Sequence, residues 1–419
     1  MLKRLLTLIF ITLIIAGGFI GFRMATAPSN LSFSPTYSLP DFVNLEDIFS
    51  SQTYANIKYA IAIDGTPVYA NSQTTQPTAS TAKMILALMV IDKKPFEPGT
   101  EGETITITPE MYSRYTYYTS IDGSTTPMTE GGTLSEYDAL ATTMLPSSNN
   151  MADSLAIWAF GDLDTYRTYA TDKLKEWGIT DTTIGSDASG FSNSTTSTAS
   201  DLAKIGYRVM KDPVLAKIVG LSSYVAPMAG TIDNTNKLLG IDNISGVKTG
   251  YIGDESGYCL VVAYLQDSHI ITVTTLDAAT RAESFIISQN LVEKLQQSLT
   301  TNSVLAKDQE VGYYDSWWTG KVAVTATEDA SVLGWSSAEK TAEVVMNDGS
   351  GSSDTSASPN PSDLAKSINS VGPVNIQGKL KITISGASSE YLVESAPISP
   401  QPSLWQRFLY AIGQNPLNK

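Results

Sequence analysis

The first apolar run of the chain predicts a membrane-crossing segment at the amino terminus. Residues 5–22 carry no charge and form a stretch long enough to span the hydrocarbon core of a bilayer. Lys3 and Arg4 precede this stretch, and basic residues on that side favour a cytoplasmic amino terminus. The small residues before Pro28 resemble a signal-peptidase site, but a proline directly after such a site disfavours cleavage. We therefore predict a signal anchor over residues 1–27, with a cleaved signal peptide as the alternative.

A spacer and then a β-hairpin are predicted next. Residues 28–45 are rich in Ser, Pro and Asn, which is typical of a linker that holds a domain away from the membrane. Beyond the linker, residues 58–63 and 66–70 are mainly β-branched, apolar and aromatic, and the turn dipeptide Asp64-Gly65 separates them. Two such runs around a turn dipeptide predict an antiparallel hairpin.

Helical spacing follows the hairpin, and strand patterns return later. Residues 84–91 are apolar nearly all round, as in a helix buried within a domain. Residues 134–145 have helical periodicity and end before Pro146. A short turn separates them from a second helical run at residues 151–160. Further antiparallel strands are predicted over residues 244–251, 258–265 and 269–276.

A small β domain is predicted over residues 308–396. Its alternating runs are 320–327, 330–335, 342–346, 378–385 and 391–394. Within this domain, residues 348–363 are dominated by Gly, Ser, Asp and Pro, which predicts a disordered loop without function. The tail at 400–419 contains apolar residues on one helical face after Ser403. Weak membrane adhesion, packing on the β domain and a free tail all remain open for it.

Composition and charge narrow the class of protein. The 419 residues are 42% hydrophobic, which is enough for two folded domains. A net charge of −15 argues against nucleic acid as a partner, because nucleic acid needs clustered Lys and Arg. The one cysteine, Cys259, excludes an intramolecular disulfide, and its apolar neighbours predict a buried thiol. A catalytic triad could use only the one histidine, His269, and a zinc site of His and Cys ligands cannot be assembled.

The scarcity of histidine directs attention to Ser80-Thr81-Ala82-Lys83. Residues three apart share a helix face, so the Lys83 amine can reach the Ser80 hydroxyl at the start of the apolar helix. Lowering the pKa of a lysine by about 3 units takes roughly 4 kcal/mol of environment. A buried helix and a second cation nearby would supply that environment. Alone, however, a serine and a lysine at this spacing arise easily by chance.

Two further motifs lie in suitable contexts. Ser147 and Asn149 fall in the turn between the two predicted helices, where the serine can relay a proton and the asparagine can fix a lysine and a substrate carbonyl. Lys248, Thr249 and Gly250 lie on a predicted strand. They offer a second cation, a hydroxyl, and a position where a ligand can approach the strand closely. Each motif is weak singly, but all occur in order.

Together these motifs resemble those of the serine-type D-alanyl-D-alanine carboxypeptidases, the low-molecular-weight penicillin-binding proteins. The resemblance rests on three segments, namely 79–84, 146–150 and 246–251, with support from 187–203 and 234–239. It covers roughly residues 54–299. It implies an α+β fold in which a β-lactamase/transpeptidase-like domain at 46–300, an antiparallel sheet with flanking helices plus a helical cluster, precedes the small all-β domain. No metal or organic cofactor is implied.

The resemblance also implies a role for each site residue. Ser80 would attack the terminal D-Ala-D-Ala peptide bond and form an acyl-enzyme, while Lys83 takes its proton. Ser147 would pass a proton to the departing D-alanine, and Asn149 would orient Lys83 and the peptide. The substrate carboxylate would be held by residues of the strand and of the helix after the last hairpin. These residues are Lys248, Thr249 and Arg281, next to Gly250; an arginine at 281 could also be a solvated helix residue.

The implied protein is a membrane-tethered, extracytoplasmic peptidase. Its partners would be peptidoglycan stem peptides, with β-lactam antibiotics as inhibitors, and its oligomeric state is open. A D,D-endopeptidase would use the same residues. A β-lactamase is disfavoured, because Ser148 replaces the aspartate of the commonest β-lactamases and no Glu-x-x-Leu-Asn stands between Asn149 and Lys248. A catalytically silent wall-binding protein is the non-enzymatic alternative.

Overall fold

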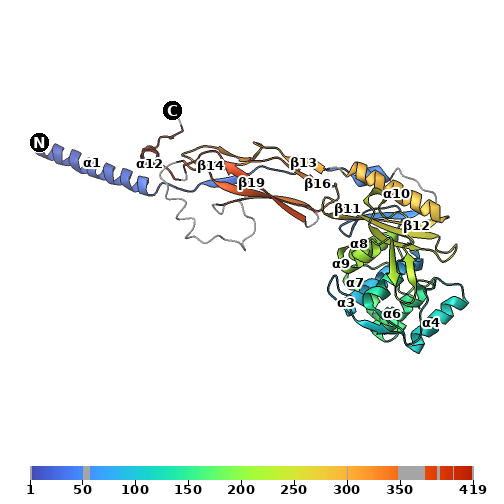
Figure 1. The fold of residues 1–419 in the computed structure, drawn as a ribbon. Coiled ribbons are helices and arrows are strands. Elements are labelled where there is room, and N and C mark those ends of the chain that lie inside the picture. Colours follow the sequence, from blue (N-terminus) through green and yellow to red (C-terminus); the bar gives the residue numbers. More distant parts are fainter. Residues whose placement is uncertain are drawn as a thin grey trace. The chain divides into compact units, whose positions relative to one another are not determined.

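The computed structural model forms two compact units, which are described separately (Figure 1). The central unit is Val43–Thr300, and the composite unit joins Met1–Phe42 to Thr301–Lys419. The structure describes residues 2–50, 57–299, 301–347, 373–384, 387–399 and 401–417. The disordered loop expected at 348–363 lies outside these residues.

The central unit contains a five-stranded antiparallel sheet with the order β10-β11-β12-β2-β3. The predicted hairpin over 58–70 and the predicted strands after residue 244 are confirmed. Asp64 and Gly65 both have positive φ, at 48° and 77°, which is the backbone that tight two-residue hairpin turns require. The strands are β2 (Lys58–Ile63), β3 (Thr66–Ala70), β10 (Gly246–Gly250), β11 (Tyr258–Gln266) and β12 (His269–Ala278).

Helices α8 (Ala199–Lys211) and α10 (Arg281–Ser298) cover opposite faces of this sheet (Figure 1). The hydroxyl of Thr272 on β12 donates to a carbonyl of α8, whereas the hydroxyl of Thr275 bonds that of Ser288 on α10. The two threonines lie three positions apart along the strand, so their side chains leave opposite faces of it. Gly206 lets α8 approach the sheet, because a Cβ there would lie 2.7 Å from Val261.

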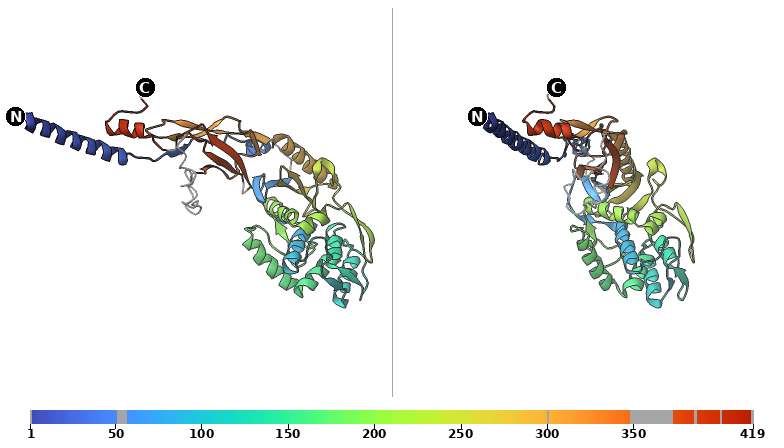
Figure 2. Two further views of the ribbon diagram at one scale, coloured as in Figure 1. Left: turned by 60° about the vertical axis from the view of Figure 1, so that its left-hand side comes forward. Right: turned by 90° about the vertical axis from the view of Figure 1, so that its left-hand side faces the viewer.

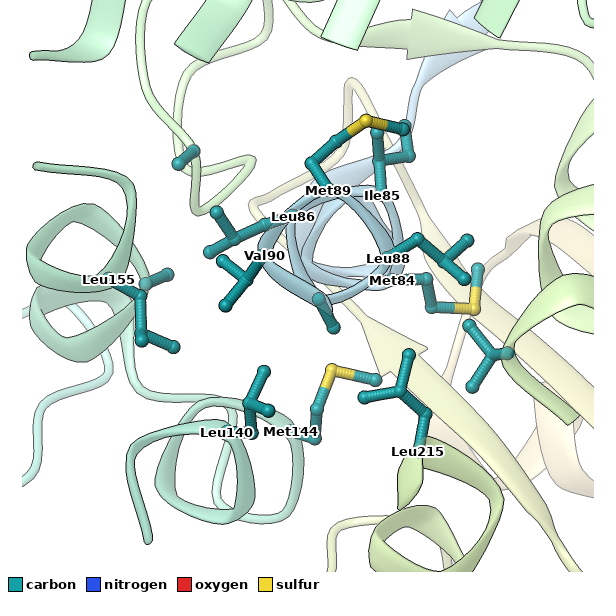
Figure 3. Packing of buried hydrophobic residues seen from close by; sticks show 14 of the residues in the cluster. Met84, Ile85, Leu86, Leu88, Met89, Val90, Leu140, Met144, Leu155 and Leu215 are labelled. Atoms are coloured by element: carbon teal, nitrogen blue, oxygen red, sulfur yellow. The ribbon is translucent and has the colours of Figure 1, made fainter. Parts of the chain in front are cut away.

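A cluster of helices around α3 forms the rest of the core. α3 (Lys83–Lys93) buries every residue from Lys83 to Val90. Figure 3 looks along it and shows Leu140 of α5, Leu155 of α6 and Leu215 of α9 arranged around it. The buried helix predicted at 84–91 is confirmed. The surrounding helices are α5 (Glu136–Met144), α6 (Asn149–Phe160), α7 (Leu163–Glu176) and α9 (Pro213–Val219).

Short elements complete the central unit. The helical elements are α2 (Leu45–Phe49), η1 (Ala79–Ala82), α4 (Pro109–Ser120) and η2 (Ile241–Asn243). The strand pairs are β4 (Gln76–Pro77) with β7 (Thr196–Ser197), β5 (Thr104–Thr106) with β6 (Thr133–Ser135), and β8 (Ser223–Ala226) with β9 (Gly230–Asp233). The helix expected from residue 134 starts later, at Glu136, because Ser135 caps it in a capping box with Asp138.

The composite unit holds a six-stranded sheet with the order β1-β14-β15-β19-β18-β17. The strands are β1 (Ser32–Pro35), β14 (Glu310–Asp315), β15 (Val322–Ala326), β19 (Ala387–Ser395), β18 (Gln377–Ile384) and β17 (Lys340–Met346). A separate pair is formed by β13 (Thr301–Leu305) and β16 (Ala330–Leu333). The fold class expected from the sequence, a mixed α/β unit followed by an all-β region, is confirmed.

The segment at 28–45 corrects one expectation. It was predicted to be a spacer, yet its residues 32–35 pair with β14 as an edge strand of the composite unit. Phe33 explains the pairing, because its ring packs on Tyr314 and fills the place that a side chain at Gly312 would occupy. A composition rich in Ser and Pro therefore conceals a strand whose partner lies far away in the sequence.

The composite unit also brings the two terminal helices, α1 and α12, into contact (Figure 2). α1 (Leu2–Ala25) is apolar and long enough to cross a membrane over Lys3–Ala25. The carboxy-terminal helix α12 (Leu404–Ala411) lies beside the end of α1, with the Arg23 guanidinium 5.5 Å from the ring of Tyr410. Leu404 and Trp405 remain exposed. One face of α12 therefore packs within the composite unit, while Leu404 and Trp405 do not take part in this packing.

Candidate active site

Ser80 and Lys83 lie one turn apart, where η1 runs into α3. The Nζ of Lys83 is 2.8 Å from the Oγ of Ser80. It also donates to the Oδ1 of Asn149 and to the carbonyl oxygen of Ser189, each at 2.7 Å. An ammonium has three donors, and loss of one proton leaves two. Asn149 and Ser189 can accept those two, so the lone pair of a neutral Lys83 faces the Ser80 hydroxyl.

Ser147 and Asn149 are placed by the junction of α5 and α6. Ser148 caps α6 by accepting from the Met151 backbone, and the Asn149 backbone donates to the Ser124 carbonyl at 2.7 Å. Ser147 has a φ of 67°, a conformation that L-residues other than Gly, Asn and Asp rarely adopt. Such backbone is often held at functional sites by its surroundings. The turn thus presents Ser147 on one side and Asn149 towards Lys83.

The end of strand β10 runs alongside the nucleophile. Lys248 is buried, and its Nζ donates to the carbonyl of Thr249 at 3.1 Å. The hydroxyl of Thr249 bonds the hydroxyl of Thr235 at 2.7 Å. A Cβ at Gly250 would lie 3.1 Å from the Ser80 backbone nitrogen, which is tighter than most real contacts. Glycine therefore lets β10 lie against the backbone of the serine.

A cavity of about 160 Å³ opens beside Ser80. Of the predicted site residues, it is lined by Ser80, Ser147, Thr249, Gly250 and Arg281. The remaining three, Lys83, Asn149 and Lys248, are buried next to these residues rather than on the cavity wall. All the predicted site residues therefore gather around one cavity.

The cavity wall also contains residues that the sequence analysis did not assign to the site. They are Ser124, Pro146, Thr235, Tyr251, Tyr258, Cys259, Ser284 and Phe285. Tyr251 and Tyr258 stack with ring centroids 4.1 Å apart, and Tyr251 is exposed. Four of the missed residues carried a signal. Pro146, Thr235 and Tyr251 lie in segments that carry the resemblance, and Ser284 follows Arg281 by one helical turn.

Burial is the main influence on the two lysines. It lowers the pKa of Lys83 to about 7, against the opposing charges of Asp187 and Asp153. Burial and repulsion from Lys83 also hold the pKa of Lys248 well below its ordinary value. The second cation was expected to help neutralise Lys83. In the structure burial has the larger effect, and the repulsion is most evident in the pKa of Lys248.

His269 and Cys259 lie outside this chemistry. The Nδ1 of His269 is 2.5 Å from Asp64 in the turn between β2 and β3. His269 pairs with Gln266, while Cys259 pairs with Gly250 near Ser80. Cys259 and Gln266 lie seven positions apart on β11, which is a distance of roughly 23 Å along the strand. His269 is therefore too far away to act as the base for Ser80. Burial raises the pKa of the Cys259 thiol to about 12, as in an unreactive buried cysteine.

Comparison with known proteins identifies the family and the fold. The sequence model for the peptidase family described as D-alanyl-D-alanine carboxypeptidase matches residues 55–280. The crystal structure of the Streptomyces K15 DD-transpeptidase shares the fold at a TM-score of 0.51 and 23% identity, over 59% of this chain and 97% of that one. A peptidoglycan synthesis regulatory factor from Streptococcus pneumoniae gives a TM-score of 0.59 at 19% identity, over 83% of this chain and 100% of that one.

No match was found among curated proteins. The two structures establish the fold, and the family model covers the region that contains every predicted site residue except Arg281, which follows it directly. The serine and lysine at the start of a buried helix, the interhelical turn and the strand beside the nucleophile all belong to this region. The chain is a member of the D-alanyl-D-alanine carboxypeptidase family of serine peptidases.

Proposed function

We propose that this serine D,D-peptidase of peptidoglycan is a carboxypeptidase that removes the terminal D-alanine from stem peptides. The observation that carries the proposal is the contact between Lys83 and Ser80, in which a buried amine with a pKa of about 7 faces the hydroxyl. An amine with that pKa is half neutral at physiological pH and can therefore act as a general base.

Acylation would begin with transfer of the Ser80 proton to Lys83. The Ser80 oxygen then attacks the carbonyl of the penultimate D-alanine, and the backbone N–H groups of Ser80 and of the residue after Gly250 stabilise the oxyanion. As the tetrahedral intermediate collapses, the C–N bond breaks and Ser147 delivers a proton to the departing amine. Water then hydrolyses the ester and releases the shortened peptide. β-Lactams would acylate the same serine.

The carboxylate of the substrate would be bound by Lys248, Thr249 and Arg281. Lys248 is buried beside another cation, so its charged form lacks compensation in the free protein. An arriving carboxylate would supply the missing negative charge and favour the protonated form of Lys248. Substrate binding would thereby stabilise the charge that holds it.

Arg281 supplies a specific prediction. It starts α10, where a cation opposes the helix dipole, and among the described residues it has no ion pair. We expect Arg281→Ala to raise KM for a pentapeptide about tenfold and to leave kcat nearly unchanged, because it removes a contact to the unreacting carboxylate. The measurement is D-alanine release at varied peptide concentration. Arg167→Ala, which breaks an exposed pair with Asp164, is the matched control. An unchanged KM would make Arg281 a solvated helix residue.

The reaction itself is tested with the full chain in detergent. A carboxypeptidase releases D-alanine from monomeric pentapeptides and stays acylated after a single exposure to penicillin. Cleavage of cross-linked dimeric muropeptides in preference to monomers would indicate an endopeptidase instead. Rapid turnover of penicillin would indicate a β-lactamase. Labelling by penicillin without reaction on either peptide would leave a wall-binding protein.

We further propose that α1 anchors the chain, with the peptidase on the extracytoplasmic side. This proposal is supported by the apolar composition of Lys3–Ala25 and by the exposed Leu404 and Trp405 of the neighbouring α12. The chain is expected to stay with membranes after carbonate extraction and to retain its first residues by mass spectrometry. A chain that starts near Pro28 would show that the segment is a cleaved signal.

A further inference from the structure

A buried carboxylate lies next to the loop whose Ser189 carbonyl contacts Lys83. Asp153 belongs to α6 and is 1% exposed. One of its oxygens accepts from the Ala188 backbone at 3.0 Å, and the other accepts from the Tyr118 hydroxyl of α4 at 2.9 Å. An ionised carboxylate in a buried position is costly unless it is paired and hydrogen-bonded. The position of Asp153 therefore calls for an explanation beyond packing.

The same network holds the carbonyl that contacts Lys83. The Tyr118 hydroxyl lies 3.2 Å from the Oγ of Ser189, and that Oγ donates to Asp187 at 2.6 Å. Asp187 also accepts from the backbone of Ser189 at 2.9 Å and from that of Phe191 at 3.1 Å, so the loop is held at several points. The Ser189 carbonyl then accepts from Lys83 at 2.7 Å. Asp153 is thus tied to this loop through the Ala188 backbone and through Tyr118, which contacts Ser189.

The charge of Asp153 acts on Lys83 together with other groups. Asp153 and Asp187 raise the pKa of Lys83 against the effect of burial. The Arg114 charge on α4 and the Tyr118 hydrogen bond lower the pKa of Asp153, although burial and Asp187 raise it to about 6. The titratable and charged groups around the lysine are Asp153 of α6, Asp187 of the loop, Lys248 of β10, Arg114 and Tyr118 of α4, and Tyr166 of α7.

We propose that Asp153 is a positioning residue that sets the protonation of Lys83, acting through Tyr118 and the loop at Ser189. The proposal rests on the function given above, in which Lys83 is the base. Asp153 keeps the amine basic enough to take the serine proton, and Tyr118 keeps Asp153 ionised by donating to it. Without this negative charge, Asp187 alone would oppose the effect of burial, and Lys83 would be a weaker base.

The sign of the expected effect follows from the charges. A nearby carboxylate favours the protonated lysine, so removing its charge lowers the pKa of Lys83. The acidic limb of the acylation rate therefore moves to lower pH in Asp153→Asn, by on the order of one pH unit. Tyr118→Phe should move it in the same direction by less, because Asp153 then loses a donor and is protonated more often near neutral pH.

The test has two readouts on the full chain in detergent. The first is an NMR titration of the protein labelled at lysine Cε, in which the Lys83 signal is assigned by its loss in Lys83→Arg. The second is the rate of acylation by fluorescent penicillin from pH 5 to 9. Both readouts are expected to shift to lower pH in Asp153→Asn.

Two control variants distinguish an effect on the pKa of Lys83 from a general structural effect of the substitution. Asp138→Asn makes the same change at another buried carboxylate, which bonds Ser135 and Tyr224 rather than the network. Tyr264→Phe removes a buried hydroxyl that has no hydrogen-bond partner among the residues that the structure describes. Neither control should move the Lys83 titration. A titration unchanged in Asp153→Asn, with a rate reduced equally at every pH, would overturn the proposal. A shifted titration in a chain that penicillin never acylates would support it and contradict the proposed function instead.

Discussion

Lys83→Ala is expected to slow acylation by penicillin about 10³-fold, because the substitution removes the general base while leaving Ser80 in place. Lys83→Arg should be equally slow, since a guanidinium keeps the charge but cannot lose its proton. Ser80→Ala should not label at all. The measurement is the rate of fluorescent labelling, followed by release of D-alanine from a pentapeptide. If Ser80→Ala still labels, another residue is the nucleophile.

The pH dependence of the parent chain supplies the internal check. Only neutral Lys83 can accept the proton, so the acylation rate should rise with pH through about 7, the pKa that burial gives this amine. Thermal unfolding of each variant is the control for misfolding. Removing a buried cation from the core need not destabilise it, so the lysine variants should unfold near the parent temperature. Labelling by Lys83→Arg at the parent rate would show that the lysine contributes charge rather than base catalysis.

Gly190→Ala is expected to destabilise the central unit by about 3 kcal/mol or more and to abolish acylation. A Cβ at Gly190 would lie 2.0 Å from the carbonyl oxygen of Ala79 and 2.7 Å from the Cβ of Ala82, so the backbone on both sides of Ser80 must move. The φ of 69° adds about 1 kcal/mol for any residue with a Cβ. Chemical denaturation gives the stability, and penicillin labelling gives the effect on the site.

Gly178→Ala is the matched control for this substitution. Gly178 has the same φ of 69°, but a Cβ there would meet nothing within 4 Å. It should therefore lose only the conformational cost, about 1 kcal/mol, and keep the parent rate of labelling. If both alanine variants behave alike, the close contact between the loop at Gly190 and Ala79 does not hold the nucleophile in place.

Local pattern was sufficient for the elements that carry the motifs. The runs at 58–63 and 66–70 are mainly β-branched, apolar and aromatic on either side of a turn dipeptide, and the run at 84–91 is apolar nearly all round, so their type depends on neighbours in the sequence. Sequence reasoning also selected eight residues that the structure brings around one cavity, because most of them belong to motifs that combine particular functional groups within a few positions. Element ends were less certain, as α5 shows, since caps such as Ser135 decide them.

Contacts between segments that lie far apart in the chain could not be predicted from local sequence pattern. β1 was predicted to be a spacer, because nothing near residue 33 indicates that Phe33 will pack beside Gly312. Asp153 lies within the second predicted helical run, and its sequence context does not show that Tyr118 and Ala188 will bond it next to the loop that contacts Lys83. The close approach of Gly190 to Ala79 is likewise a contact between remote parts of the chain.

The sequence by itself thus determined the local elements, the placement of Ser80 and Lys83 one helical turn apart, and the family, since these depend on residue types at short and regular spacing. Only the tertiary structure decided how basic Lys83 is. Its pKa depends on burial and on carboxylates brought from α6 and from the loop at Asp187. Electrostatic effects of this kind act through space between residues far apart in the chain, and no local pattern records those distances.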